Sequence, residues 1–372
     1  MLDRNSNLLL IAGGTVLLAA LIATAQEPRQ EWQLRRTDSS DMVNFTVEHW
    51  KPGSRWSSTN TVPLSRFRGL TPASFEHNGK VKFEYAADAG SLLCEGEFGP
   101  FLLSRRGSGW YRVMADPNFV SELQKMGYMA PTEEQTFSMI LMNVSLAFAR
   151  GARNAGLRPT TGQLIDLRAH GVTLEYIAET SAAGYDNLSV QDYIEMRNHG
   201  VSVDFLRDLK RYGYKLPVSG IVQLRNHGVT SEFIADLKDA GYDLHSSEIV
   251  ELRNHGVDSR FLGDLHAYGV HPSVPDLVQL RNHGVNAEFL HDLKNAGYDQ
   301  LPVNQVTDLR AHGVNGEFVK DAKALGYNFT AQELINLRSH GVDAGYLRRL
   351  RDAGMKNLTA DQIAKLRMHG VD

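Results

Sequence analysis

One short string recurs along most of this chain at a nearly fixed interval. R-x-H-G-V occurs eight times, and consecutive histidines of the string are 28 or 29 residues apart. A period of this length is typical of solenoids, in which each unit buries its apolar face only by stacking on its neighbours. The recurrence therefore predicts a tandem α-helical array over residues 118–372, with about nine repeats.

A second signature divides each period into two short helices. An aromatic residue is followed eight positions later by glycine nine times, from Phe119 and Gly127 to Tyr346 and Gly354. Because glycine readily adopts the left-handed conformation that ends a helix, we expect one helix to end at each His-Gly and the next at the second glycine. The helix-end residues predicted for the first set are His170, Gly171, His199, Gly200, His227, Gly228, His255, Gly256, His283, Gly284, His312, Gly313, His340, Gly341, His369 and Gly370.

Both ends of the array depart from this pattern, as expected for repeats with a single neighbour. The earliest copy has Asn143 where the others have glycine, and asparagine also tolerates a left-handed backbone. The first copies are therefore predicted to be degenerate but helical. One further helix of the first type precedes Asp372, which predicts a C-terminal half-repeat.

Residues 41–117 show a different pattern, in which hydrophobic and polar residues alternate. Val43, Phe45 and Val47 are separated by single polar residues, and such a period of two predicts half-buried antiparallel strands. All four tryptophans precede residue 118. We therefore predict an α+β chain: a linker at residues 26–40, a small N-terminal antiparallel β domain at 41–117, and then a long α-solenoid of short two-helix repeats.

The N-terminal segment predicts export. Residues 7–25 are uncharged and mostly apolar, and they end in Ala23-Thr24-Ala25, a small-residue pattern that favours signal-peptidase cleavage. We predict a signal peptide at residues 1–25. The alternative is an uncleaved N-terminal anchor, because a segment of this length just spans a hydrocarbon core. Either interpretation places the remaining chain in the periplasm or outside the cell.

Composition and motifs argue against several classes of protein. The net charge of −4 and the pI near 6.4 do not favour a nucleic-acid partner, which a basic surface would attract. The sequence has no G-x-S-x-G, no G-x-x-x-x-G-K, no G-x-G-x-x-G and no H-E-x-x-H. We predict no enzymatic activity, no catalytic residue and no cofactor. The lone Cys94 excludes an internal disulfide and shares its parity with Leu92 and Phe98, which predicts a buried thiol.

The repeated histidines raise the question of metal binding. Equivalent residues in stacked helices lie roughly 10 Å apart, whereas zinc needs its imidazoles within about 2.1 Å of one ion. We therefore predict no metal site, and we expect each histidine to bond the carbonyls at its helix end. Adventitious zinc or copper binding stays open, because further histidines lie outside the repeated position. They are His245, His266, His271 and His291.

Each repeat also carries an arginine, and most repeats carry an acidic residue three positions after the aromatic residue. Guanidinium groups pair well with carboxylates, so we expect an arginine–carboxylate ladder between helices. The alternative is an arginine stripe that recognises a partner, together with the mostly small or polar residue before each histidine. The candidate partner surface comprises Arg197, Asn198, Arg225, Asn226, Arg253, Asn254, Arg281 and Asn282.

The strings L-R-N-H-G-V, F-L-x-D-L and A-G-Y resemble a short bacterial helical repeat. Arrays of that repeat occur in exported proteins and are appended to membrane metallopeptidases of the beta-lactam-sensor type. The resemblance covers about residues 118–372, and it implies an array that binds partners or acts as a spacer. The peptidase function is not implied, since the chain lacks H-E-x-x-H.

These observations predict an exported, non-enzymatic scaffold or spacer that interacts with a protein partner of unknown identity. Membrane contact is expected only through an uncleaved N-terminal segment. Two alternatives remain: a zinc- or copper-binding histidine array, and a small-ligand site in the β domain. Aromatic residues for such a ligand site are Trp50, Trp56, Trp110 and Tyr111, although a small sheet also needs such residues for its core.

Overall fold

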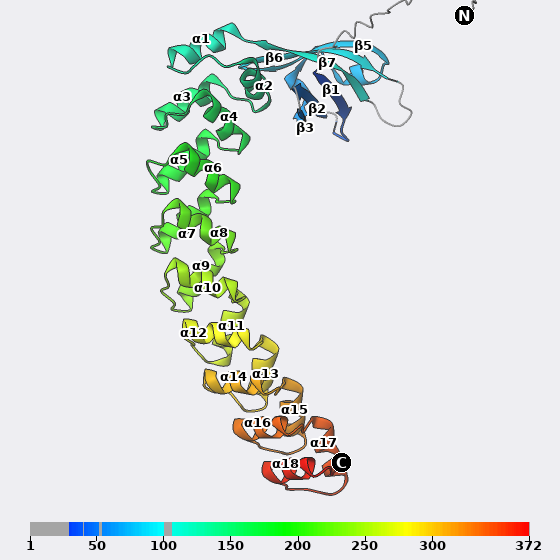
Figure 1. Ribbon diagram of the computed structural model, residues 1–372, viewed down its shortest axis with the longest axis vertical. Coiled ribbons are helices and arrows are strands. Elements are labelled where there is room, and N and C mark those ends of the chain that lie inside the picture. The colour runs from blue at the N-terminus through cyan, green and yellow to red at the C-terminus, as the bar shows by residue number, and fades with distance from the viewer. Residues whose placement is uncertain (1–29, 40, 52–53, 100–105, 372) are drawn as a thin grey trace, which may run out of the picture. The chain divides into compact units, whose positions relative to one another are not determined.

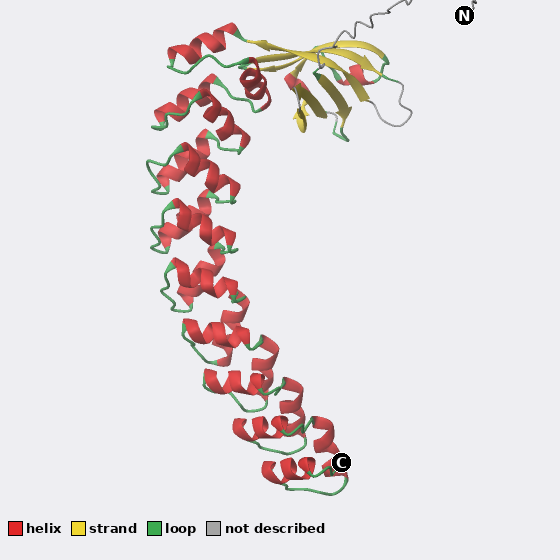
Figure 2. Ribbon diagram, viewed as in Figure 1, coloured by secondary structure: helices red, strands yellow, loops and turns green. Residues whose placement is uncertain are grey.

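The computed structural model describes residues 30–39, 41–51, 54–99 and 106–371. It divides the chain into two compact units, Met1–Ser121 with Pro131–Asn143 and Glu122–Ala130 with Val144–Asp372. The first contains an antiparallel sheet and the second contains repeated helices, which confirms the predicted α+β class (Figures 1 and 2). The predicted signal peptide lies outside the described residues.

The sheet has seven strands in the order β3-β2-β1-β7-β6-β5-β4, and every neighbouring pair is antiparallel. The strands are β1 Glu31–Arg36, β2 Met42–Lys51, β3 Ser54–Pro63, β4 Phe67–Arg68, β5 Gly79–Ala87, β6 Gly90–Phe98 and β7 Arg106–Ala115. The prediction of a linker at residues 26–40 is wrong there, because β1 pairs with β2 on one side and with β7 on the other. Its alternating Trp32 and Leu34 are buried.

The core of this unit lies on one face of the sheet. Trp32, Phe45 and Phe83 are at most 3 % exposed, and the ring of Phe83 lies edge-on to Trp32 with centroids 4.8 Å apart. Trp32 Nε1 donates to the main-chain carbonyls of Glu95 (3.2 Å) and Trp110 (3.1 Å). The largest side chain of the core therefore has its polar atom satisfied, as a buried indole requires.

Helix α2, Glu133–Leu141, belongs to the sheet unit. Its Phe137 stacks on His49 with ring centroids 4.6 Å apart and on Tyr111 at 5.7 Å. By sequence α2 is the first-type helix of the earliest repeat copy, so the predicted boundary at residues 117 and 118 is wrong for this helix. It carries the helix pattern of the array but covers the apolar face of the sheet.

The remaining helices are short, and from α3 to α16 each packs on the helix two positions further along the chain. They are α1 Pro117–Lys125, α3 Leu146–Asn154, α4 Thr161–Ala169, α5 Leu174–Ala182, α6 Val190–Asn198, α7 Val203–Arg211, α8 Val218–Asn226, α9 Ser231–Asp239, α10 Ser246–Asn254, α11 Ser259–Tyr268, α12 Val274–Asn282, α13 Ala287–Asn295, α14 Val303–Ala311, α15 Gly316–Ala324, α16 Ala331–Ser339, α17 Ala344–Asp352 and α18 Ala360–Met368. Contacts from α3 to α17 link the odd-numbered helices, which we call the odd row, and contacts from α4 to α18 link the even row.

The helix ends match the sequence prediction. The glycine after each of the eight histidines has φ between +66° and +76°, and Asn143 replaces it with φ +52°. Gly171 N bonds Arg168 O at 3.0 Å and Val172 N bonds Leu167 O at 2.8 Å, the paired bonds of a Schellman ending. Val172 is fully buried. The R-x-H-G-V string thus encodes a helix end whose valine returns to the core.

Candidate functional site

The arginine of R-x-H-G-V lies at the contact between consecutive repeats. In all eight copies its guanidinium carbon lies over the aromatic ring of the preceding repeat, 4.8–5.4 Å from the ring centroid. The pairs are Arg168 and Phe148, Arg197 and Tyr176, Arg225 and Phe205, Arg253 and Phe233, Arg281 and Phe261, Arg310 and Phe289, Arg338 and Phe318, and Arg367 and Tyr346. These cation–π contacts join each even-row helix to the odd-row helix of the repeat before it.

The same arginines donate to main-chain carbonyls near helix ends. Arg225 Nη1 donates to Val229 O in its own repeat at 2.9 Å. Arg338 Nε donates to Gly313 O in the preceding repeat, also at 2.9 Å. Carbonyls at a helix C-terminus have no partner within the helix, and cations are favoured there. The arginine therefore stabilises the helix ends as well as the contact between repeats.

The guanidinium also fills the space beside the helix-ending glycine of the preceding repeat. A Cβ at Gly256 would lie 3.3 Å from Nη2 of Arg281, and one at Gly228 would lie 3.6 Å from Nη2 of Arg253. This glycine thus meets two requirements: it adopts the left-handed backbone, and it leaves room for the arginine of the next repeat.

The predicted arginine–carboxylate ladder is wrong. In the part of the chain that the structure describes, no salt bridge is formed by the seven arginines Arg168, Arg197, Arg225, Arg253, Arg281, Arg310 and Arg338. Three of the seven acidic residues instead face the second residue after the aromatic residue of the next repeat. Such pairs are Glu179 and Arg207, whose charged atoms are 3.4 Å apart, Asp292 and Lys320 at 2.6 Å, and Asp321 and Arg348. An exposed pair such as Glu179 and Arg207 contributes at most about 1 kcal/mol.

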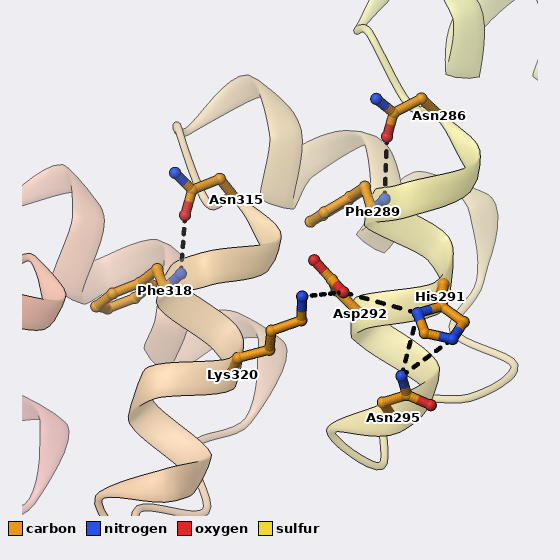
Figure 3. Close-up of polar contacts among 8 residues, drawn as sticks. All are labelled: Asn286, Phe289, His291, Asp292, Asn295, Asn315, Phe318 and Lys320. Carbon is orange, nitrogen blue, oxygen red and sulfur yellow. Dashed lines mark hydrogen bonds and ion pairs between the residues drawn. The ribbon is translucent and has the colours of Figure 1, made fainter.

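Asp292 differs from the other acidic residues because its side chain is only 4 % exposed. Its Oδ1 forms an ion pair with Nζ of Lys320 in the next repeat (Figure 3). This contact raises the pKa of Lys320. Its Oδ2 occupies the space beside Gly316 that a side chain at that position would need. A Cβ added at position 316 would lie 1.8 Å from Oδ2 of Asp292. Gly316 therefore provides the space for the buried carboxylate.

A polar ladder runs along the ends of the even-row helices. His170 Nδ1 bonds Asn198 Oδ1 of the next repeat at 2.6 Å. The same bond joins His227 to Asn254 at 2.6 Å and His255 to Asn282 at 2.8 Å. We call this row the His–Asn ladder. It comprises four pairs, of which the second is not bonded: His170 and Asn198, His199 and Asn226, His227 and Asn254, and His255 and Asn282.

In two of the three copies whose next repeat lacks asparagine, the histidine turns back to its own helix. His312 Nδ1 bonds Asp308 O at 2.9 Å, and His340 Nδ1 bonds Asn336 O at 2.8 Å. The predicted bond between histidine and a helix-end carbonyl is therefore confirmed for these two residues only. In the five histidines His170, His227, His255, His312 and His340 the partner of Nδ1 is an oxygen that accepts, so Nδ1 carries the proton and Nε2 keeps its lone pair when the ring is neutral.

The candidate partner surface separates into two classes of residue. Arg225, Arg253 and Arg281 are half-buried, and Arg197 is exposed although its guanidinium lies over Tyr176. The four asparagines are exposed. Because the arginines are used between repeats, the asparagines and histidines present the unshielded polar groups of this surface.

No metal site is formed by the described residues: no three His, Cys, Asp or Glu side chains are grouped closely enough to hold an ion. A hollow of about 570 Å³ between α11 and α13 is lined by Arg260, Asp264, Tyr268, His291 and Lys294 among others. It mixes both signs of charge with apolar surface. The histidine in it bonds Asn295 on its own helix, at 3.1 Å from Nδ1.

The aromatic candidates of the β domain do not gather into one site. Trp56 pairs with His49, and Tyr111 pairs with Cys94, so Trp56 and Tyr111 lie on the core face of the sheet. There both rings contact Phe137 of α2. Strand alternation places Trp50 and Trp110 on the opposite face. The predicted buried thiol is confirmed, because Cys94 is fully buried and burial raises its pKa.

Two contacts were missed by the sequence reasoning, and both cross from one repeat to the next. The aromatic partner of each arginine had no local signal, because it lies about 20 residues earlier in the chain. The His–Asn bond did have a signal. Asparagine precedes histidine in four consecutive copies, Asn198 to Asn282, a regularity that an unconstrained exposed position does not require.

No helix in the described residues is both long and apolar enough to cross a membrane. No protein-family model matches the chain, and a comparison with curated proteins found no match.

Proposed function

We propose that this protein is an exported, non-enzymatic scaffold that binds a protein partner along the His–Asn ladder. The observation that carries the proposal is the ladder itself: exposed polar side chains recur once per repeat, and in three of the four His–Asn pairs a bond between repeats holds them in place. A surface that is ordered before binding loses less conformational entropy when a partner binds.

The ladder offers complementary groups to a polypeptide. Where Asn Oδ1 accepts from histidine, Asn Nδ2 still has two N–H donors, and the neutral histidine offers Nε2 as an acceptor. A peptide main chain presents C=O and N–H groups that match these two functions. The arginines contribute by holding the repeats in register rather than by contacting the partner.

Export is a second part of this proposal, and it is supported by the sequence of residues 7–25 and by the resemblance to repeats of exported bacterial proteins. N-terminal sequencing of the protein recovered from the periplasm or the medium tests it. We expect the chain to begin at Gln26. A chain recovered in the cytoplasm with its first residues intact would contradict export.

Affinity capture from an envelope extract tests the interaction. The tagged full chain is compared with a variant carrying Ala at Asn198, Asn226, Asn254 and Asn282. The matched control carries Ala at Gln191, Gln223 and Gln279, which are exposed on the same even-row helices outside the ladder.

We expect the asparagine variant to lose a partner that the glutamine control retains. Equal capture by both variants would assign the partner to another surface. If the unmodified chain captures nothing, the array acts as a spacer rather than as a binding scaffold.

A further inference from the structure

Strand β3 forms one edge of the sheet in the first unit (Figure 1). All ten of its residues pair with β2, from Met42↔Pro63 to Lys51↔Ser54. Within residues 30–39, 41–51, 54–99 and 106–371, no strand pairs with its other edge. Half of the main-chain donors and acceptors of an edge strand point away from the sheet, so such an edge is a template for a further strand.

β3 has few of the features that normally prevent this pairing. Natural edge strands are commonly short, charged, interrupted by proline or bulged. In β3 the only charged residue is Arg55 and the only proline is Pro63, which both lie near its ends. The central residues 56–62 have an uninterrupted one-to-one register with β2 and carry no charge.

We propose that a second copy of this chain pairs with β3 edge to edge and antiparallel, with a two-fold axis at Thr59. A two-fold axis perpendicular to the sheet keeps the core faces of both copies on one side. Residues that oppose each other must then belong to the same face. Trp56 and Val62 lie on the core face, since they pair with His49 and Val43, whereas Thr59 lies on the other face.

The two-fold axis at Thr59 brings complementary residues together. Trp56 of each copy then opposes Val62 of the other, an aromatic–β-branched pair of the kind that stabilises sheets. Trp56 is 42 % exposed, so it has apolar surface to bury in such a pair. Ser57 opposes Thr61, and Arg55 opposes Pro63, so no like charges meet.

Neighbouring registers are less favourable. An axis at Ser58 would place Trp56 opposite the polar Asn60, and an axis at Asn60 would place it opposite Leu64, beyond the end of the strand. Of these three registers, only the axis at Thr59 pairs the two apolar residues of the edge, Trp56 and Val62. It also gives every residue from 55 to 63 an opposing residue in the other copy. The occupant that fits this edge is therefore the edge itself.

Cysteine cross-linking of the full chain tests the register. The single native thiol, Cys94, is fully buried, so an introduced cysteine is the reactive one. In Thr59→Cys the two thiols face each other across the axis. In Ser57→Cys or Thr61→Cys the identical positions are four residues apart along the strand, about 13 Å.

With a bismaleimide shorter than that distance, we expect a covalent dimer from Thr59→Cys and none from either control alone. Co-expressed Ser57→Cys and Thr61→Cys chains should give a mixed dimer, because these two positions oppose each other. Equal cross-linking of all three single variants, or no cross-linking of Thr59→Cys, would overturn the proposal.

The mass in solution provides an independent measurement. Thr59→Lys places two ammonium groups at the axis, on an exposed side chain of the edge. We expect this full-length variant, analysed by sedimentation in detergent, to be monomeric where the unmodified chain is dimeric. The far-ultraviolet circular dichroism of both should be the same. An unchanged mass, or a monomeric unmodified chain, would contradict edge pairing.

Discussion

The guanidinium carbon of Arg253 lies 5.1 Å from the ring centroid of Phe233, and both residues recur in almost every period. Arg253 Nη1 also donates to Val257 O at 3.2 Å. One side chain thus contacts the preceding repeat while it stabilises the end of its own helix. This arrangement explains why arginine rather than lysine recurs, since a planar guanidinium can stack and donate at once.

Arg253→Met keeps the length of the side chain and removes its stacking charge and its donors. We expect a loss of about 1–2 kcal/mol in the free energy of unfolding, measured by urea denaturation. The free energy of unfolding of Arg253→Lys should lie between those of the unmodified chain and Arg253→Met. Arg260→Met, at an exposed position of α11, is the matched control and should lie within about 0.5 kcal/mol of the unmodified chain. Equal effects at both positions would contradict the role of the stacked arginine.

Gly316→Ala should destabilise the array by more than about 1 kcal/mol, because the new Cβ would overlap the buried carboxylate of Asp292. Gly263→Ala is a helical control with open space around its Cβ, and it should stabilise by up to about 1 kcal/mol. Urea denaturation of both variants shows whether the change in the free energy of unfolding has opposite signs at the two positions. Adding Asp292→Ala to Gly316→Ala should recover part of the loss; no recovery would assign the cost to another contact.

Gly228 has φ +69°, and its substitutions should follow backbone preference. Gly228→Val should cost more than about 1 kcal/mol, since a β-branched residue is strained in the left-handed region. Gly228→Asn should cost less, as the presence of Asn143 at φ +52° in the earliest copy suggests. Thermal unfolding of the two variants checks the order. A valine variant as stable as the asparagine variant would contradict the role of a left-handed residue at this helix end.

Stability should decrease at alkaline pH because of buried tyrosines. Burial raises the pKa of Tyr176 and of Tyr242 to about 12 from the ordinary value of 10.0. Above pH 10 the unfolded chain loses protons that the folded chain keeps, so the free energy of unfolding should fall progressively between pH 10 and pH 12. Urea midpoints measured across this range test the sign. Tyr242→Phe should flatten the decrease and lower stability at neutral pH, because Tyr242 donates to Pro272 O at 2.6 Å.

Zinc should bind the chain weakly. Histidines of the ladder hold Nδ1–H against an oxygen and leave Nε2 available, but the described residues bring no three ligands together. Calorimetric titration should therefore show no set of equivalent sites tighter than about micromolar. Several such sites would support the histidine-array alternative.

The period and the glycine positions predicted the array because a helix end is a local requirement. A left-handed residue must sit where the helix stops, and only glycine or asparagine satisfies it easily, as Gly171 and Asn143 do. Strand β1 was missed because only Trp32 and Leu34 show its alternation, a signal too short to separate a strand from a linker. Its place between β2 and β7 depends on partners distant in sequence.

The candidate surface was harder to predict because charge alone does not identify a partner. Arg225 and Asp236 are complementary in charge, yet the Arg225 guanidinium lies over Phe205 of the preceding repeat. The four asparagines of the candidate surface are exposed, while their bonds to histidine depend on how neighbouring repeats are offset. That offset is set by packing along both rows and is not encoded at any single position.

Every inner repeat supplies an arginine to the repeat before it and an aromatic residue and a glycine to the repeat after it. The two sides of a repeat are therefore different, and each side fits the opposite side of any other repeat. Removing or duplicating one whole period joins surfaces that already match. We expect the array to tolerate changes of length in steps of one period, with the spacing between the remaining ladder residues preserved. The length of the array is then set by the number of repeats.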